Sequence, residues 1–311
     1  MSRNYGLGSR DMSIAGNFAL KNEARKGLIS FSTAGTNSER WAIFVKWAKQ
    51  NNIRKMENIT TDLVKEYGRH LAEKVHLTEL SEATAQNYVS AVNSVMSIAK
   101  KSEWKSVSPT QDCGIGKRCA IRLRPPGALD QDLYNQALKE VHEKMGERVA
   151  AMVDLCIQLG LRSKEASLIN AHDVYTASLQ CDEVMITAGT KGGRARKVPI
   201  SDIQRAALRR AAFAQGQDNS MIPEYRSWRQ WRQNELRQAR EIVQSTTGGG
   251  LRDLRSTYAC IRYAALAGFP APVILGNIID RDKDLKVREI ISRELGHGRI
   301  DVINEYIGGR S

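Results

Sequence analysis

A proline pair followed by glycine, Pro125-Pro126-Gly127, is the feature that most constrains how this chain folds. Proline has no backbone N–H and disfavours helix at the residue before it, so a helix running through this point is not expected. The length of 311 residues also exceeds the usual size of one domain. We therefore expect an N-terminal extension at 1–35, a helical domain at 36–105, a linker at 106–127 and a second domain at 128–311.

Apolar side chains before this break recur at helical spacing. Trp41, Phe44, Val45 and Ala48 follow at intervals of three and four residues, which places them on one face of a helix. Side chains suited to N-capping open this helix and two more, at Thr36, at Thr60 or Thr61, and at Ser81 or Thr84. The pattern predicts a compact all-helical module.

The chain after the break combines helices with one small sheet. Strands are predicted at 184–188 and 196–200, because they flank the turn 190–194, where two glycines can supply positive φ. Helices are predicted at 130–145, 148–159, 203–214, 224–243, 254–266, 288–295 and 300–307, with a charged loop at 280–284. The expected fold class is mainly α with a small β-sheet.

The net charge of +13 is the first indication of a partner, because such a basic balance is expected of proteins that bind a polyanion such as nucleic acid. There is no apolar run of membrane-spanning length and no secretory signal, so we expect a cytoplasmic, nucleoid-associated protein. Basic side chains in and just before the linker are our candidates for DNA contact: Lys100, Lys101, Lys105, Lys117, Arg118, Arg122 and Arg124. The alternative is a solvated charge run.

Five separated residues have the chemistry of phosphodiester transfer. A free tyrosine phenol has a pKa near 10, so a tyrosine nucleophile needs a group that removes its proton and a target made electrophilic. Tyr306 is our candidate nucleophile. Arg162 and Arg255 could each hold two phosphate oxygens and neutralise the charge of the transition state. Lys191, on the turn, could protonate the leaving oxygen, and His297 could bond the phosphate or orient the nucleophile.

Each of these residues also has a purely structural interpretation. Arg162 could simply pair with Glu165, Tyr306 could pack in the core, and His297 could cap a helix. The five cysteines contain no Cys-x-x-Cys pair, so we expect neither a standard zinc site nor a disulfide framework. In the proposed chemistry the arginines take the place of a metal ion, and no cofactor is expected.

Four motifs in order resemble the tyrosine recombinases, also called phage integrases. They are Gly-Leu-Arg-x-x-Glu at 160–165, the lysine hairpin at 190–200, Leu-Arg-x-Thr-Tyr-Ala at 254–259, and Leu-Gly-His at 295–297 with a tyrosine nine residues after the histidine. The resemblance is detailed over 128–307 and looser over 36–105, which is similar to the family's helical, SAM-like core-binding domain.

The resemblance implies a two-domain, C-shaped clamp around duplex DNA that serves a mobile genetic element. Tyr306 would attack a phosphate, leaving a 3′-phosphotyrosine and a free 5′-hydroxyl, with no cofactor consumed. Four protomers would assemble on two DNA sites and exchange strands through a Holliday junction. Whether an accessory DNA-bending protein takes part is left open.

The sequence departs from the family pattern at Arg252, where the family has a histidine three residues before its second arginine. Arginine keeps the hydrogen-bond donors but cannot accept the tyrosine proton, because its pKa exceeds 12. The segment 270–286 is also longer than a compact member needs. Because only 307–311 follow the tyrosine, a long C-terminal exchange helix is not expected.

Two other functions remain open at this stage. A type IB topoisomerase would use the same chemistry as a monomer to relax supercoils. The alternative from another class of protein is a DNA-binding regulator with impaired catalysis. This alternative is suggested by Arg252, which replaces the family's histidine. The sequence does not identify the DNA site, because base readout depends on a few side chains in the grooves.

Overall fold

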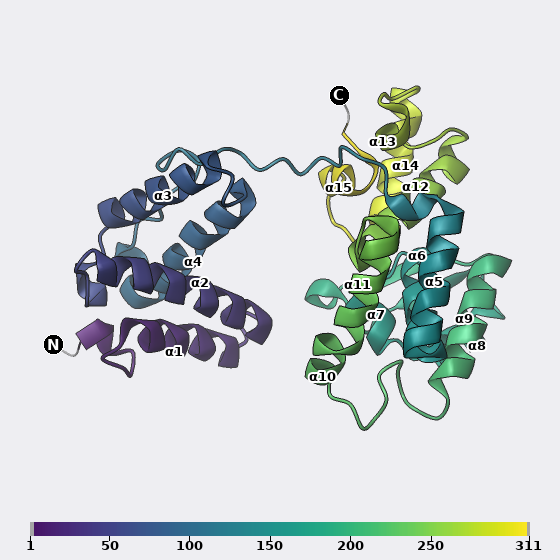
Figure 1. Ribbon diagram of the computed structural model, residues 1–311, viewed down its shortest axis with the longest axis horizontal. Coiled ribbons are helices and arrows are strands. Elements are labelled where there is room, and N and C mark those ends of the chain that lie inside the picture. Colours follow the sequence, from purple (N-terminus) through teal and green to yellow (C-terminus); the bar gives the residue numbers. More distant parts are fainter. Residues whose placement is uncertain (1–2, 310–311) are drawn as a thin grey trace. The chain divides into compact units, whose positions relative to one another are not determined.

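The structure is a computed structural model that describes residues 3–309 (Figure 1). Its contacts divide it into two compact units, the first ending at Cys119 and the second beginning at Ala120. Most of the regular structure is helical, which confirms the expected fold class of mainly α with a small β-sheet. Among the helices of residues 3–309, none combines the length and apolar character needed to cross a membrane.

The first unit is a bundle of capped helices around an aromatic core. Its elements are η1 (Arg3–Gly6), α1 (Met12–Arg25), α2 (Phe31–Gln50), η2 (Met56–Asn58), α3 (Thr61–His76), α4 (Glu82–Lys100) and η3 (Lys101–Glu103). Ser30, Thr60 and Ser81 each accept a hydrogen bond from a backbone amide at the start of the next α-helix. In the core, the Phe44 ring lies 5.3 Å from Trp41 and 5.0 Å from Tyr67 between centroids.

The residues before Thr36 are helical and pack into this unit. α1 lies along α2, and the buried Trp41 donates from Nε1 to the carbonyl of Met12 at 2.8 Å. Glycine at position 16 permits the contact, since a Cβ there would lie 2.2 Å from that nitrogen. α2 begins at Phe31, earlier than the position expected from Thr36, because Ser30 already supplies the cap.

The second unit holds the two-stranded sheet and the remaining helices. They are η4 (Gly127–Leu129), α5 (Gln131–Met145), α6 (Glu147–Gln158), α7 (Ser163–Leu168), α8 (Ala171–Ser178), β1 (Glu183–Ile186), η5 (Lys191–Gly193), β2 (Arg196–Pro199), α9 (Asp202–Gln215), α10 (Trp228–Gln233), α11 (Glu235–Thr247), α12 (Leu251–Ala267), α13 (Pro272–Leu275), α14 (Arg281–Glu294), η6 (Asp301–Ile303) and α15 (Asn304–Ile307). The strands are antiparallel, with Glu183 opposite Pro199 and Ile186 opposite Arg196.

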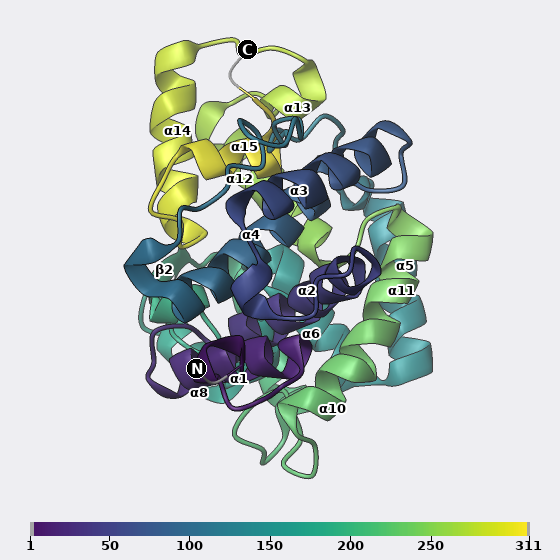
Figure 2. The ribbon, with the colours of Figure 1, turned by 90° about the vertical axis from the view of Figure 1, so that its left-hand side faces the viewer.

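Helix α6 runs through the core of the second unit and is buried from Val149 to Ile157. It packs against α5, α9 and α12, and Figure 2 shows α11 beside α5. The hairpin follows α8, and β2 packs against α14. This packing brings the hairpin turn near the chain that leaves α14.

Some predicted helix bounds in the second unit were wrong. The segment 224–243 is not one helix: Asn234, at φ −107° and ψ −81°, separates α10 from α11. The charged segment 280–284 is not a loop but the start of α14, where the Asp280 side chain accepts from the amides of Asp282 and Lys283. Acidic side chains stabilise a helix N-terminus, so this charge run indicates a cap.

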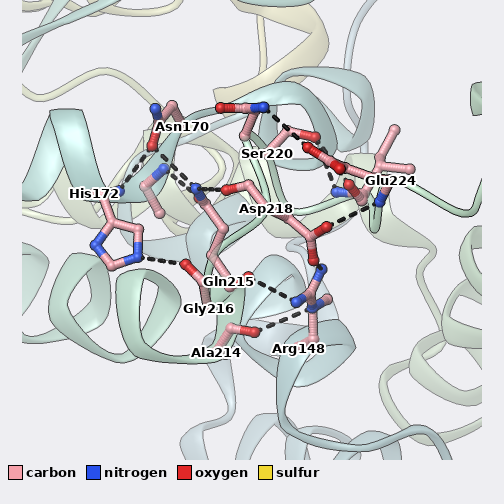
Figure 3. Close-up of polar contacts among 12 residues, drawn as sticks. Arg148, Asn170, His172, Ala214, Gln215, Gly216, Asp218, Ser220 and Glu224 are labelled. Atoms are coloured by element: carbon pink, nitrogen blue, oxygen red, sulfur yellow. Dashed lines mark hydrogen bonds and ion pairs between the residues drawn. The ribbon is translucent and has the colours of Figure 1, made fainter.

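A polar network fixes the chain after α9 (Figure 3). Arg148 of α6 donates to an Asp218 carboxylate oxygen at 2.6 Å, and Gln215 donates to the Asp218 carbonyl at 2.7 Å. His172 of α8 contacts the carbonyl of Gly216 through Nε2 at 2.9 Å. The network thus ties α6, α8 and α9 together.

Candidate active site

Five segments of the second unit end around one hollow of about 940 Å³. They are the start of α7, the turn between the strands, the start of α12, the loop after α14, and α15. The side chains that line the hollow include Arg162, Lys191, Arg252, His297 and Tyr306 together with Arg194, Arg299 and Glu305. Five of the six predicted catalytic residues therefore meet here, and the sixth, Arg255, lies against two of them.

Arg255 is 1% exposed and joins two chain segments beneath the hollow. Its guanidinium donates to the carbonyl oxygens of Gly160, after α6, and Leu295, after α14. It also lies 3.4 Å from His297 Nε2 and 5.6 Å from the centroid of the Tyr306 ring. Burial lowers the pKa of Arg255 to about 10, so it remains a cation at neutral pH.

A buried carboxylate, Glu165, holds the arginines of the site in place. It accepts from Arg162 at 2.7 Å and from both terminal nitrogens of Arg196 at 2.9 and 2.7 Å, and it lies 3.7 Å from Arg255. Burial alone would raise the pKa of Glu165, but these hydrogen bonds and charges hold it below its usual value. The carboxylate therefore stays ionised and offsets part of the positive charge.

Sequence reasoning missed Glu165 and Arg196 as members of the site. Arg196 is nearly buried and faces inward from β2 on the same side as Val198. An arginine at an inward strand position requires a buried partner. The alternation of the strand pattern could have identified Arg196, but its partner lies 31 positions away and only the fold brings them together.

His297 and Tyr306 form a hydrogen-bonded pair. The His297 Nε2 lies 3.1 Å from the Tyr306 hydroxyl, and Tyr306 is 4% exposed. Burial lowers the pKa of His297 to about 3, and the charges of Arg255 and other nearby cations act in the same direction. The ring is therefore neutral at neutral pH and has a nitrogen able to accept a hydrogen bond.

The Leu-Gly-His motif has a structural explanation. Gly296, with φ +66°, turns the chain at the end of α14, and a Cβ there would lie 3.0 Å from the Arg196 side chain. The turn presents the Leu295 carbonyl to Arg255 and the His297 ring to Tyr306. Each residue of the motif thus serves the site.

The unusual residue Arg252 lies in the hollow with the other candidates. Its guanidinium forms an ion pair with Glu305, the neighbour of Tyr306, and lies 6.0 Å from the centroid of the Tyr306 ring. Its side chain is 72% exposed, so it is accessible from solvent. Arg252 therefore presents a cation at the mouth of the site rather than a proton acceptor.

Lys191 is exposed on the turn between the strands and lines the same hollow. Gly192 and Gly193 follow it with φ of +70° and +69°, a conformation that other residues rarely adopt. The turn thus projects a lysine toward the hollow on a short, solvent-exposed segment. Among residues 3–309, no group of three or more His, Cys, Asp or Glu side chains is arranged to hold a metal ion.

The basic residues proposed for DNA contact do not form one surface within a single unit. Lys100, Lys101, Lys105, Lys117 and Arg118 belong to the first unit, and Arg122 and Arg124 to the second. Lys100 lies over the Trp104 ring at 5.8 Å, and Arg122 forms an ion pair with Asp253. Lys117 and Arg118 are exposed. Their contact with DNA stays a prediction.

Two family models match consecutive segments of the chain. The one described as a phage integrase SAM-like domain matches residues 16–115, and the one described as an integrase matches residues 120–260. No curated protein matched the chain. The motifs at 295–297 and 306 lie beyond the second match.

Solved structures of recombinases share the fold. XerH site-specific recombinase, bound to palindromic difH substrate in a post-cleavage complex, is 15% identical with a TM-score of 0.61, covering 96% of this chain and 82% of that one. The Tn1549 transposon integrase in complex with transposon right end DNA is 12% identical with a TM-score of 0.57 and coverage of 94% and 95%. A lambda integrase dimer bound to a COC′ core site is 14% identical with a TM-score of 0.54 and coverage of 94% and 77%.

Proposed function

This chain belongs to the tyrosine recombinase, or phage integrase, family, and from that membership we propose that it cuts and rejoins duplex DNA through Tyr306. It is a tyrosine-type site-specific recombinase by fold and family. The observation that carries the proposal is the bond of 3.1 Å between the Tyr306 hydroxyl and a neutral His297, beside a cluster of arginines. Service to a mobile element is supported by the resemblance to a transposon integrase.

In the proposed reaction the Tyr306 oxygen attacks the phosphorus of one DNA strand. The bond between phosphorus and the 5′ oxygen breaks, and a 3′-phosphotyrosine forms. His297 Nε2 is neutral and lies within hydrogen-bond distance, so it accepts the hydrogen bond of the phenol and orients its oxygen, and the phenolic proton passes to solvent. Lys191 delivers a proton to the departing 5′ oxygen. Attack by a 5′-hydroxyl of a partner duplex reverses these steps and joins the strands.

The arginines stabilise the charge that develops during this reaction. Arg162 and Arg252 line the hollow and can donate to nonbridging phosphate oxygens. Arg255, close to the tyrosine ring, favours the phenolate electrostatically. Glu165 keeps the group oriented before DNA arrives. In this assignment guanidinium groups do the work that a metal ion does in other phosphoryl-transfer sites.

A covalent trapping experiment tests the proposal without knowledge of the target. The protein is incubated with a pool of nicked duplexes that have a randomised core, and adducts resistant to SDS are isolated and sequenced. Wild type should give an adduct, Tyr306→Phe should give none, and Tyr225→Phe, which alters an exposed tyrosine, should behave as wild type. An adduct that persists in Tyr306→Phe would show that another residue is the nucleophile.

The trapping experiment, together with relaxation and strand-exchange assays, separates the two alternatives. A protein that binds duplex DNA but never forms an adduct would be a regulator, the alternative suggested by Arg252 and its pairing with Glu305. A protein that forms the adduct and relaxes supercoils, yet never exchanges strands between two marked duplexes, would be a topoisomerase. Assembly of four protomers on two sites is part of our proposal, and an accessory DNA-bending protein can be tested by adding it.

A further inference from the structure

Arg122, three positions after the first unit ends, is bound to the helix that carries two candidate arginines. Its terminal nitrogens donate to the two carboxylate oxygens of Asp253 at 2.8 and 3.0 Å, and one also donates to the Ser256 hydroxyl at 3.2 Å. Its Nε donates to the carbonyl of Arg124 at 2.7 Å. The guanidinium is therefore directed into its own unit. Asp253 lies in the first turn of α12, between Arg252 and Arg255.

The same stretch of linker also binds the helix of the nucleophile. The backbone amide of Arg122 donates to the carbonyl of Asn304, the first residue of α15, at 2.9 Å. At the other end of α15, the Ile121 side chain packs so closely that a Cβ at Gly309 would lie 3.1 Å from it. Two neighbouring linker residues thus contact the chain on both sides of Tyr306.

Helix α15 needs such external contacts because it has only four residues. An isolated helix of this length does not form in water, since nucleation costs more than one turn of hydrogen bonds returns. From the inside, Arg288 of α14 donates to the Asn304 side chain at 2.8 Å and to the Gly308 carbonyl at 3.1 Å. The linker supplies the other contacts, through the Arg122 amide and the Ile121 side chain.

We propose that Arg122 is a positioning residue, which fastens the interdomain linker to α12 and α15 and so holds Tyr306 in line with the arginines. The proposal rests on the function given above. It assigns the Arg122 side chain an internal contact in place of the DNA contact expected from the sequence. The chain enters the second unit at this point. A displacement of the linker would therefore reach α15 through the hydrogen bond between the Arg122 amide and the Asn304 carbonyl.

The first test compares cleavage with binding in Arg122→Ala and Asp253→Asn. Single-turnover adduct formation is measured at saturating concentrations of a nicked duplex recovered by trapping. A displacement of about 1 Å can cost roughly 10²-fold in rate, so we expect each variant to lose about tenfold or more. The double variant should lose no more than the worse single variant, because both remove one interaction. Arg209→Ala, on the exposed face of α9, is the control for loss of an arginine.

The salt dependence of binding separates positioning from a phosphate contact. Each phosphate contact contributes about 0.9 to the slope of log affinity against log salt concentration on duplex DNA. On a mixed-sequence duplex we expect Arg122→Ala to keep the wild-type slope and affinity. A slope reduced by about 0.9 together with weaker binding would overturn the proposal in favour of a DNA contact.

Hydrogen exchange tests the anchor in the absence of DNA. Amides within 304–309 should exchange faster in Arg122→Ala and in Asp253→Asn than in wild type, whereas amides of α9 should not change. Unchanged exchange at 304–309 in both variants would overturn the proposal. If wild type gave no adduct, the proposed function would fall, yet this measurement would still decide whether the linker holds the helix.

Discussion

Arg252 already contacts two groups with which a bound phosphate would compete for its guanidinium. It pairs with the Glu305 carboxylate and lies over the Tyr306 ring. We expect Arg252→Ala to lower the rate of adduct formation by about 10²-fold, as the loss of an oxyanion donor does. Arg252→His should keep substantial activity, because it keeps a donor at this position. Both rates are measured in single turnovers on trapped substrate.

The comparison between the two variants decides the role of this position. If Arg252→Ala cleaved as fast as wild type, Arg252 would stand outside the reaction and its place in the hollow would be incidental. If histidine and alanine were equally slow, the guanidinium itself, with its paired donors, would be required.

The low pKa of His297 makes the folded protein sensitive to acid. The folded ring takes up a proton only near pH 3, whereas the ring in the unfolded chain does so near pH 6.5. Between these values the unfolded chain binds more protons, so the free energy of unfolding falls as the pH falls. We expect His297→Gln to lose less of this free energy than wild type over that range, in urea unfolding at a series of pH values.

His297→Gln and wild type should have parallel stability above about pH 7, where the imidazole is neutral in both states. Equal losses below pH 6.5 would mean that the buried ring is protonated as easily as a free one. In that case His297 could not remain a neutral hydrogen-bond acceptor for Tyr306 at lower pH.

At the scale of elements, local signals in the sequence predicted most helices but not the contacts between elements. Caps and apolar spacing are local, so α5, α6 and the hairpin could be predicted close to their observed bounds. The break at Asn234 was missed because the helical pattern continues across it. The predicted catalytic residues are single positions in motifs, whereas the contacts of Glu165 with Arg196 and Arg255 depend on packing that no local pattern encodes.

The carboxylate that joins α7, β2 and α12 should matter to stability as well as to chemistry. Removing one partner of a buried charge network costs about 3–5 kcal/mol, because the remaining charges stay buried without compensation. We expect Glu165→Gln to lose free energy of unfolding of that order, measured in denaturant. Glu183→Gln, which breaks an exposed pair with Lys197, should lose less than about 1 kcal/mol.

A Glu165→Gln protein as stable as the Glu183→Gln control would mean that the three arginines tolerate one another without the carboxylate. The interpretation of Glu165 as the group that orients Arg162 and Arg255 would then be wrong.

At the scale of the whole molecule, the sequence placed a linker at 106–127 and the contacts change from one unit to the other within it. Trp104, Val107, Cys113 and Ile115 are buried in the core of the first unit. From Arg122 onward the chain is bound to the second. These contacts are made by single side chains within an irregular stretch. The proline pair alone therefore could not predict which linker residues pack on which unit.

Limited proteolysis should therefore separate the units at one place. Residues 116–121 are exposed and have no regular secondary structure, and they include Lys117 and Arg118. We expect trypsin to cut first at these two positions and to leave two fragments that resist further digestion, identified by mass spectrometry. A first cut inside either unit, for example in the hairpin turn at Lys191, would contradict this division.

The contacts of Arg255 have a consequence for how such sequences evolve. Because its guanidinium ties together the chain after α6 and the chain after α14, natural selection for a stable fold acts on it even where activity is irrelevant. A descendant that had lost the reaction would keep this arginine. Lys191 is exposed on a glycine turn, so selection for a stable core would not retain it once the proton transfer that we propose for it was unused. Among distant relatives, loss of the lysine would therefore mark the decay of the enzyme long before loss of the arginine.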